Sequence, residues 1–348
     1  MKEQYLKIFC TKNAVLLLMI FVGRMTTLYA QDLNFSQYYN TPLLVNPANT
    51  GFNPDYDYRI GGNYRNQWAS VGVPYKTMGI WADTKLFANR FENGWMGVGG
   101  SIIKDVAGSG NLSSTGGYAS LAYHQMIGNS SLLSAGFSAG VVAKRIDYNK
   151  LRFDNQWNGQ FFDISVPPNE PFAYTQTGYL DVQVGLNYAL FASDNAYFNV
   201  GVSLMHINRP SESFFAPSIS NSQLEMRYTY FANASIKLQD VWIVNPNIYV
   251  SKMGNAKEVL LGFNANRDLG DNGAQQMILG LYYRTNDAAI PLIGFQKNDL
   301  TITVNYDATV SSLKNLNGAR GAYELSIVKH GLFPSSSGRS IKCPSVRF

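Results

Sequence analysis

The sequence predicts an all-β chain, an antiparallel transmembrane β-barrel of about 14 strands that follows a cleaved signal peptide. Three observations predict this class: a short apolar segment near the start, long runs in which apolar and polar residues alternate, and sparse charge. Of the 348 residues, 46% are hydrophobic, 14% aromatic and 15% charged, whereas globular chains average about 25% charged residues. The many aromatic residues exclude a disordered chain, and two cysteines exclude a disulfide-rich scaffold.

Residues 1–30 resemble a secretory signal peptide. Three lysines precede an apolar run over 14–22, and Ala30 supplies a small residue at the expected cleavage point. That run is too short to span a membrane, which takes about 20 residues. Its removal takes away four of 28 basic and one of 23 acidic residues, so the chain from Gln31 onward carries 24 and 22, or +2. This small charge indicates no nucleic-acid partner.

The longest alternating run extends from Leu180 to Leu190, where every second residue is Leu, Val or Tyr. Side chains alternate between the two faces of a strand, so this run has one apolar and one largely polar face. Its length is about 33 Å at roughly 3.3 Å per residue. Tilted by about 45°, the run matches the apolar band of an outer-membrane barrel, whereas soluble strands commonly have about five or six residues. A soluble β-sandwich is the alternative fold, and it leaves the signal peptide and the long one-sided strands unexplained.

Fourteen segments of this kind lie between turn signals such as Glu92-Asn93-Gly94. They are residues 57–68, 73–86, 94–105, 114–127, 131–148, 177–191, 196–207, 227–238, 242–252, 257–267, 275–285, 290–297, 299–307 and 320–329. An even number suits an antiparallel closed barrel.

The segments divide the chain into four parts: a signal peptide (1–30), an N-terminal anchor or plug segment (31–56), the barrel (57–330) and a C-terminal tail (331–348). Two long irregular stretches interrupt the barrel, at about 149–176 and 208–226. Long loops are typical of the extracellular side of such barrels, whereas periplasmic turns are short.

Motifs at both ends of the predicted mature chain point to one family. Residues 35–51 read Phe-Ser-Gln-Tyr-Tyr-Asn-Thr-Pro-Leu-Leu-Val-Asn-Pro-Ala-Asn-Thr-Gly, and residues 64–68 read Tyr-Arg-Asn-Gln-Trp, followed by Pro-Tyr-Lys-Thr at 74–77. Tyr-Asp at 306–307, Gly-Ala-Tyr-Glu-Leu-Ser at 321–326 and the terminal Lys-Cys-Pro-Ser-Val-Arg-Phe complete the pattern. Together these motifs resemble the PorP/SprF family of the type IX secretion and gliding machinery of Bacteroidota.

The resemblance implies a protein of the cell outer membrane that has no enzymatic chemistry and no cofactor. Its implied partners are outer-membrane lipid, type IX secretion components and a secreted adhesin that carries a type IX C-terminal signal. The implied function is to recruit, export or retain that surface protein. A channel or uptake porin for small solutes is the alternative function, and an open lumen would favour it over a lumen filled by residues 31–56 and the tail.

The motifs select a set of structural or interaction candidates, with no catalytic or metal-binding residue among them. The candidates are Tyr38, Asn40, Pro42, Asn46, Pro47, Arg65, Gln67, Trp68, Asp307, Glu324, Cys343 and Phe348. Prolines fix φ and disfavour helix in the preceding residue, so Pro42 and Pro47 predict a rigid, non-repetitive segment. We expect that segment to fold into the periplasmic mouth or the lumen as an anchor; the alternative is a lead-in that orients the first strand.

Alternation places Arg65 and Gln67 on one face of the first strand, with Trp68 on the other. An Arg65 side chain that faces the lumen needs a carboxylate partner, and Asp307 or Glu324 in the last strands can provide one. The first and last strands of a closed barrel pair with each other, so the contact is geometrically plausible. We interpret it as a lock between barrel and plug rather than a cargo-binding site.

The tail after the last strand carries Cys343 and ends at Phe348. Many outer-membrane proteins end in Phe, but Pro344 interrupts the last few residues, so a final-strand assembly signal is disfavoured. We expect the tail to turn into the periplasmic mouth or to meet a partner there, and Cys343 to be a buried structural thiol rather than a redox group.

The three histidines, His124, His206 and His330, lie far apart in the sequence and match no metal-ligand or hydrolase motif. We therefore expect polar residues of the barrel wall at these positions. An outer-membrane enzyme is a third function, and it would require a Ser or Asp close to one of these histidines in space.

Overall fold

The computed structural model describes residues 34–53, 55–69, 73–91, 93–170, 174–216, 222–270 and 273–333. The predicted signal peptide at 1–30 lies outside this part of the chain, as do Cys343 and Phe348 of the predicted tail.

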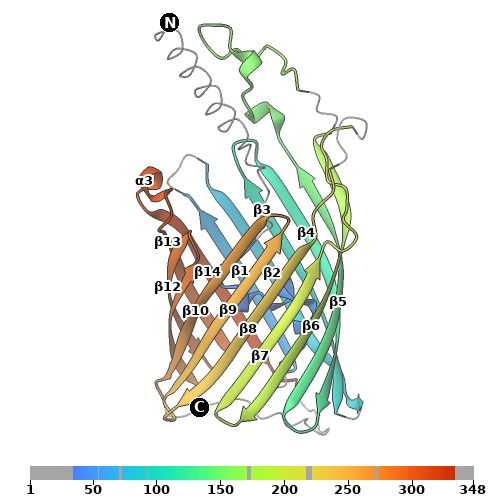
Figure 1. The fold of residues 1–348 in the computed structure, drawn as a ribbon, viewed down its shortest axis with the longest axis vertical. Helices are drawn as coiled ribbons and strands as arrows, with labels where there is room; N and C mark the ends of the chain where they lie inside the picture. Colours follow the sequence, from blue (N-terminus) through green and yellow to red (C-terminus); the bar gives the residue numbers. More distant parts are fainter. Residues whose placement is uncertain are drawn as a thin grey trace, which may run out of the picture. The chain divides into compact units, whose positions relative to one another are not determined.

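The strands form one closed antiparallel barrel in which each strand pairs with its neighbours in the sequence and β1 pairs with β14 (Figure 1). The strands are β1 (Tyr58–Gln67), β2 (Tyr75–Phe91), β3 (Gly94–Ala107), β4 (Leu112–Ile127), β5 (Ser131–Arg145), β6 (Gln176–Ser193), β7 (Ala196–Met205), β8 (Arg227–Leu238), β9 (Trp242–Met253), β10 (Ala256–Asp268), β11 (Gln275–Arg284), β12 (Ala288–Lys297), β13 (Leu300–Thr309) and β14 (Arg320–Gly331). The predicted 14-strand barrel is confirmed. No helix in the described part of the chain is long and apolar enough to cross a membrane.

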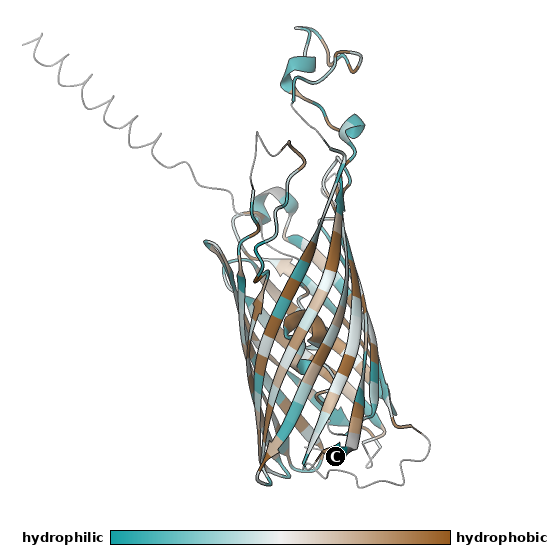
Figure 2. Ribbon diagram, turned by 90° about the vertical axis from the view of Figure 1, so that its right-hand side faces the viewer, coloured by the Kyte–Doolittle hydropathy of each residue, from teal (hydrophilic) through white to brown (hydrophobic). Residues whose placement is uncertain are grey.

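The strands form because their alternation matches the two sides of the barrel wall. In β5 the outward Phe137 and Val141 are 49% and 66% exposed, whereas the inward Ser134 and Ser138 are buried. The same alternation runs along the neighbouring strands, so apolar and polar bands follow one another along each ribbon (Figure 2). The wall therefore presents apolar side chains outward and polar ones to the lumen, which is the arrangement of a barrel that sits in lipid.

Several predicted strand ends differ from the observed ones; β2, for example, ends at Phe91 and not at residue 86. Two of the differences have a clear local cause. β1 ends at Gln67 and not at Trp68, which still donates its backbone N–H to the Gly321 carbonyl at 2.8 Å but has a φ of 56° that turns the chain out of the strand. β5 ends at Arg145 and not at residue 148, because Asp147 accepts a hydrogen bond from the backbone of Asn149 and starts a 3-10 turn, η3 (Tyr148–Lys150). In both places a local turn competes with strand pairing.

The two ends of the barrel differ in loop length. Tight turns, such as those at Asn93 and Gly128 with φ of 57° and 65°, connect strands at one end, the short-turn end. The two longest loops, 146–175 and 206–226, lie together at the other, the long-loop end (Figure 1). The backbone N–H of Tyr174 donates to the carbonyl of Phe214 at 3.1 Å, so the two loops are joined. Long loops in such barrels face the cell exterior.

Residues 34–53, which we refer to as the lumenal segment, lie inside the barrel (blue in Figure 1). They form three short helical turns: η1 (Tyr38–Asn40), α2 (Pro42–Val45) and η2 (Pro47–Asn49). The Asn34 side chain donates a hydrogen bond to Glu258, which lies near the first residue of β10 at the long-loop end. Gly51 bonds Asp83 of β2 near the short-turn end, where the chain enters β1. The segment therefore crosses the lumen from the long-loop end to the short-turn end.

A charge on the outward face should test the lipid-facing assignment. We expect Phe137→Arg, near the middle of β5, to lower the free energy of unfolding in lipid vesicles by about 2–4 kcal/mol, because arginine is costly at the bilayer midplane. Ile127→Arg, at the short-turn end of β4, should cost about 0–1 kcal/mol, because it lies at the interface. Denaturant unfolding of both variants measures the difference, and equal costs would contradict the assignment.

Candidate functional site

The two prolines set the local fold of the lumenal segment. Pro42 is the first residue of α2 and Pro47 the first of η2. Proline suits this position because its fixed φ is helical and the missing N–H has no helical partner there. Between the turns, Asn46 caps η2 by accepting the backbone N–H of Ala48 at 2.8 Å. The sequence thus folds into successive tight turns that keep the segment narrow enough for the lumen.

Glycines in the barrel wall let the segment approach the strands closely. A Cβ atom on Gly136 of β5 would lie 2.3 Å from the backbone of Pro47 and Ala48. A Cβ on Gly185 of β6 would lie 1.8 Å from Oδ1 of Asn46. Real Cβ atoms do not approach other atoms this closely, so any larger residue at these positions would push the segment away from the wall.

Side chains and strand carbonyls of the wall satisfy the polar groups of the segment. Asn46 donates from Nδ2 to the carbonyl oxygens of Leu186 at 2.9 Å and Val202 at 3.2 Å, on β6 and β7. The indole N–H of Trp81 on β2 donates to the Asn40 carbonyl at 2.9 Å. Irregular backbone in a low-dielectric interior is costly unless its polar groups are bonded, and these contacts remove that cost.

Arg65 lies at the centre of an ion-pair cluster at the long-loop end. Its guanidinium is 2.8 Å from Oδ2 of Asp307 and 3.3 Å from Oε2 of Glu324. It also donates to the Ser36 hydroxyl at 2.6 Å. Arg284 approaches Asp307 at 2.9 Å from the other side. All three partners of the predicted lock therefore meet in space, together with the lumenal segment.

The backbone of the segment takes part in this cluster directly. The N–H groups of Ser36 and Gln37 donate to the two carboxylate oxygens of Glu324 at 2.9 and 3.0 Å. The Gln37 amide also donates to Oδ1 of Asn305 at 2.6 Å. Glu324 is fully buried, and a buried charge needs partners. Arg65 and the backbone N–H groups of the segment provide them.

Tyr38 anchors the segment on the opposite wall. Its hydroxyl lies 2.9 Å from Oδ1 of Asn233 and 3.1 Å from Oδ1 of Asn247, and its ring centroid is 4.7 Å from that of Tyr249. Burial raises the pKa of Tyr38 well above its ordinary value, so the hydroxyl stays protonated and remains a donor. Amide oxygens and aromatic rings of β8 and β9 thus fix η1 in place.

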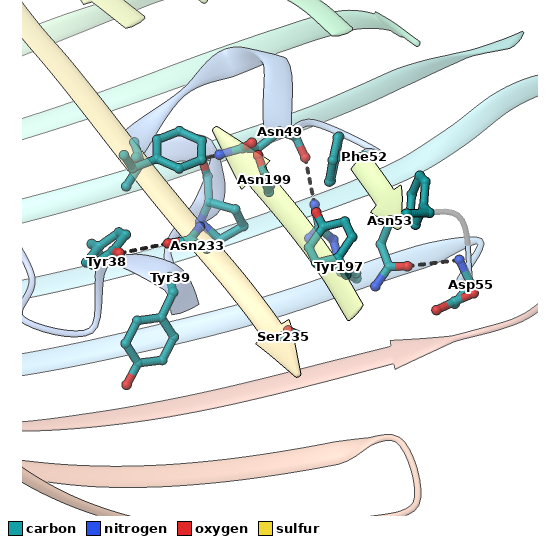
Figure 3. Close-up of a pocket in the computed structure, with 15 residues that line it drawn as sticks. Tyr38, Tyr39, Asn49, Phe52, Asn53, Asp55, Tyr197, Asn199, Asn233 and Ser235 are labelled. Atoms are coloured by element: carbon teal, nitrogen blue, oxygen red, sulfur yellow. Dashed lines mark hydrogen bonds between the residues drawn. The ribbon is translucent and has the colours of Figure 1, made fainter. Parts of the chain in front are cut away.

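A cavity of about 320 Å³ remains beside the segment, on the side of β6, β7 and β8 (Figure 3). Aromatic rings line much of it, among them Tyr39, Tyr197 and Phe231. Asn53 and Asp55 line its other end, where the segment leaves the lumen at the short-turn end. The cavity is therefore a pocket between the lumenal segment and strands that the segment also bonds.

The structure places the predicted residues in three groups. Tyr38, Asn40, Pro42, Asn46 and Pro47 lie in the lumenal segment, while Arg65, Asp307 and Glu324 form the ion-pair cluster. Gln67 and Trp68 lie at the end of β1, outside that cluster; the Trp68 ring packs edge-on against Tyr75 with centroids 5.2 Å apart. Cys343 and Phe348 lie outside the described residues.

Sequence reasoning missed Arg284 and Ser36 of the cluster, and a second ion pair between Arg59 and Asp83 at 2.5 Å. Arg59 also donates to the Asn49 carbonyl at 2.7 Å, so this pair holds the part of the lumenal segment that lies near the short-turn end. The available signal was a charge on the lumen-facing register of a strand: Arg59 shares the β1 face of Arg65.

Two histidines do lie next to a Ser or an Asp. Nδ1 of His124 is 2.7 Å from the Ser134 hydroxyl, and Nδ1 of His206 is 2.9 Å from Asp181. His124 and Ser134 are fully buried, and the other His124 nitrogen bonds a carbonyl of the lumenal segment. Asp181 is also fully buried. The first pair joins β4 to β5, and the second joins β6 to the residue after β7, so each pair connects neighbouring parts of the wall. Within the described residues, no three His, Cys, Asp or Glu side chains gather where they could hold a metal ion.

A methyl group in the glycine wall should unseat the segment. We expect Gly136→Ala to lower the free energy of unfolding by about 1–3 kcal/mol, because overpacking forces backbone shifts. The matched control is Gly117→Ala in β4, where a Cβ atom meets nothing within 4 Å. Denaturant unfolding in detergent compares the two variants, and equal stability would contradict close packing of the segment on the wall.

Removal of the central guanidinium should be strongly destabilising. We expect Arg65→Met to lower the free energy of unfolding by about 3–5 kcal/mol, because it leaves the buried Glu324 carboxylate without its cationic partner. Lys150→Met removes an exposed ion pair with Asp147 at 3.5 Å and should cost about 0–1 kcal/mol. The same unfolding experiment measures both, and a loss below about 1 kcal/mol for Arg65→Met would show that the cluster does not hold the fold.

The chain is similar to known proteins both in sequence and in fold. The family model for the type IX secretion system membrane protein PorP/SprF matches residues 27–328. No curated protein matches the chain. Among solved structures, a deletion mutant (deltaS2S3) of the monoaromatic hydrocarbon channel TodX is similar with a TM-score of 0.51 at 9% identity, covering 83% of this chain and 93% of that chain.

The toluene transporters TodX of Pseudomonas putida and TbuX of Ralstonia pickettii are similar with TM-scores of 0.49 and 0.48, at 11% and 8% identity. They cover 83% and 84% of this chain, and 92% and 94% of theirs. At this identity the solved structures bear on the fold alone, whereas the family match spans most of the sequence. The chain is an outer-membrane β-barrel that belongs to the PorP/SprF family of type IX secretion system membrane proteins.

Proposed function

We propose that this barrel is a non-enzymatic component of the type IX secretion and gliding machinery that recruits, exports or retains one specific secreted surface protein, an adhesin with a type IX C-terminal signal. The observation that carries the proposal is the lumenal segment, which is part of the same chain and is bonded to many strands of the wall. A barrel built in this way suits a rigid platform better than a wide diffusion pore.

The contacts of the segment support a permanently seated plug. At the long-loop end it bonds a buried carboxylate, Glu324, through two backbone N–H groups. In the middle it rests on glycines, and near the short-turn end Trp95 donates to the Gly51 carbonyl at 2.8 Å. Displacement would break all of these hydrogen bonds together, at about 1–3 kcal/mol for each buried polar group left unsatisfied. Solute-driven opening is therefore disfavoured.

Exposed apolar side chains at the long-loop end favour a protein partner on the cell exterior. Trp157, Phe161, Phe162 and Ile164, which we refer to as the loop cluster, are 49%, 57%, 48% and 66% exposed. The loop is ordered by its own bonds, such as that from the Gln156 side chain to the Val166 carbonyl at 3.0 Å. Exposed apolar groups held on an ordered loop are typical of interaction sites, and a secreted surface protein would meet the barrel at this end.

The channel function has one observation in its favour, the cavity of about 320 Å³ beside the segment. A cavity of this size is at the lower limit for a small-molecule site. It lies between the segment and the wall, and Tyr38 and Tyr39 line its inner part. We therefore rank transport of small solutes second.

Loss of the loop cluster should release the surface protein. We expect the combined Trp157→Ala, Phe161→Ala and Phe162→Ala variant to retain several-fold less adhesin on the cell surface, with the missing protein recovered in the medium. Fluorescent labelling of whole cells and immunoblots of the medium measure this.

The matched control is Asn169→Ala, an exposed polar residue of the same loop, which should behave as the unmodified protein. The barrel should reach the outer membrane in equal amount in all three strains. Unchanged surface adhesin in the triple variant would contradict docking at the loop cluster, and unchanged adhesin after deletion of the whole barrel would contradict the proposed function.

A further inference from the structure

The lipid-facing side of β2–β6 carries an apolar groove of about 660 Å³. One row of paired residues crosses it from strand to strand, and the large side chains of that row are 56–66% exposed. The row is Ile80, Ile102, Gly117, Val141 and Leu180. The next row toward the short-turn end has only small side chains on β2–β5: Ala82, Gly100, Ala119 and Ala139. The wall is therefore hollowed here, and a Cβ atom on Gly117 would meet nothing within 4 Å.

The groove lies just inside the outer edge of the apolar band. Thr115 and Gln125, both on the outward face of β4, are ten residues apart, or about 33 Å along the strand. Tilted by about 45°, this stretch is roughly 24 Å tall, which matches the apolar band of about 25 Å. Thr115 therefore marks the edge of the band on the side of the long loops, which face the cell exterior. Gly117, the next outward residue, places the groove in the outer leaflet.

Three cations lie on the same outward face, between the groove and the long loops. Lys104 is in the row next to the groove, and Lys76 and Arg145 are in the row beyond it. All three are exposed. Lys144, the inward neighbour of Arg145, pairs with Glu212, whereas none of the three outward cations has a carboxylate partner in the described part of the chain. Basic side chains at a membrane surface attract anionic headgroups.

The spacing of the cations favours a headgroup with two separate phosphates. Lys76 on β2 and Arg145 on β5 are three strand spacings apart, or about 14 Å at roughly 4.8 Å each. A single phosphate cannot contact both. The groove extends over four spacings, about 19 Å, so it offers room for several acyl chains side by side. Ser113 on β4, in the same row as both cations, adds a hydroxyl group between them.

We propose that this groove binds a diphosphorylated, multiply acylated glycolipid of the outer leaflet, a lipid A. The acyl chains lie on the floor of glycine and alanine residues, one phosphate meets Lys76 and Lys104, and the other meets Arg145. Lipid A fits this spacing because its two phosphates lie at opposite ends of a disaccharide. The proposal concerns only the outward face of the barrel, so it stands or falls independently of the proposed function.

Native mass spectrometry of the full-length protein in mild detergent, with added lipid A, tests this site. We expect the combined Lys104→Gln and Arg145→Gln variant to bind several-fold less lipid A than the unmodified barrel. The matched control is the combined Lys297→Gln and Lys329→Gln variant. These two exposed lysines share the outward row of Leu300 at the short-turn end, and their loss should leave binding unchanged. Equal binding by the two double variants would overturn the proposal.

A filled groove and a change of lipid provide two further measurements. Gly117→Leu should lower lipid A binding several-fold, because its side chain would occupy the groove. Cardiolipin and phosphatidylglycerol should also bind several-fold less than lipid A, because one glycerol joins the two cardiolipin phosphates and phosphatidylglycerol has only one phosphate. Undiminished binding by folded Gly117→Leu, or equal binding of either phospholipid, would overturn the proposal. If Gly117→Leu does not fold, the cation variants and the lipid comparison still decide the outcome.

Discussion

The buried ion-pair cluster around Arg65 is the interaction on which the rest of the barrel depends. It joins the first strand to the last two, through Glu324 and Asp307, and it bonds the lumenal segment at Ser36. Arg65 and Glu324 are also direct partners in the β1–β14 ladder. Closure of the barrel and seating of the segment are therefore coupled, because the same carboxylates serve both. An unpaired charge at this depth would be costly, so each part stabilises the other.

Most other features of the lumen follow from this anchor. The segment is fixed at the long-loop end by the cluster and at the short-turn end by its connection to β1, so it must cross the lumen. Because it crosses as irregular chain, the wall must supply partners for its carbonyls, as Trp81 and Trp95 do. Because it lies against the wall, glycine is required at positions such as 136 and 185. The aromatic cavity remains between the segment and β6, β7 and β8.

The sequence predicted the barrel well and the lumen in part. The strands were recognisable because one face of each meets lipid and the other meets polar groups, which produces a clear period of two. The partners of Arg65 could be predicted because closure of the barrel brings the first and last strands together. Arg284 was missed because its place in the cluster depends on how the barrel curves, which no single strand encodes. Gly136 and Gly185 were missed for a similar reason: alternation within a strand does not show what approaches it from the lumen. Trp68 was assigned to β1 because a local turn and a strand end look alike in sequence.

We propose that the lumenal segment holds the lumen closed, so that the barrel acts as a platform and not as a pore. Ion conductance of the purified full-length protein in planar lipid bilayers tests this proposal. A filled lumen predicts no steady current above that of the bare membrane, at any voltage that the membrane tolerates. A steady, porin-like current from the correctly folded barrel would contradict it.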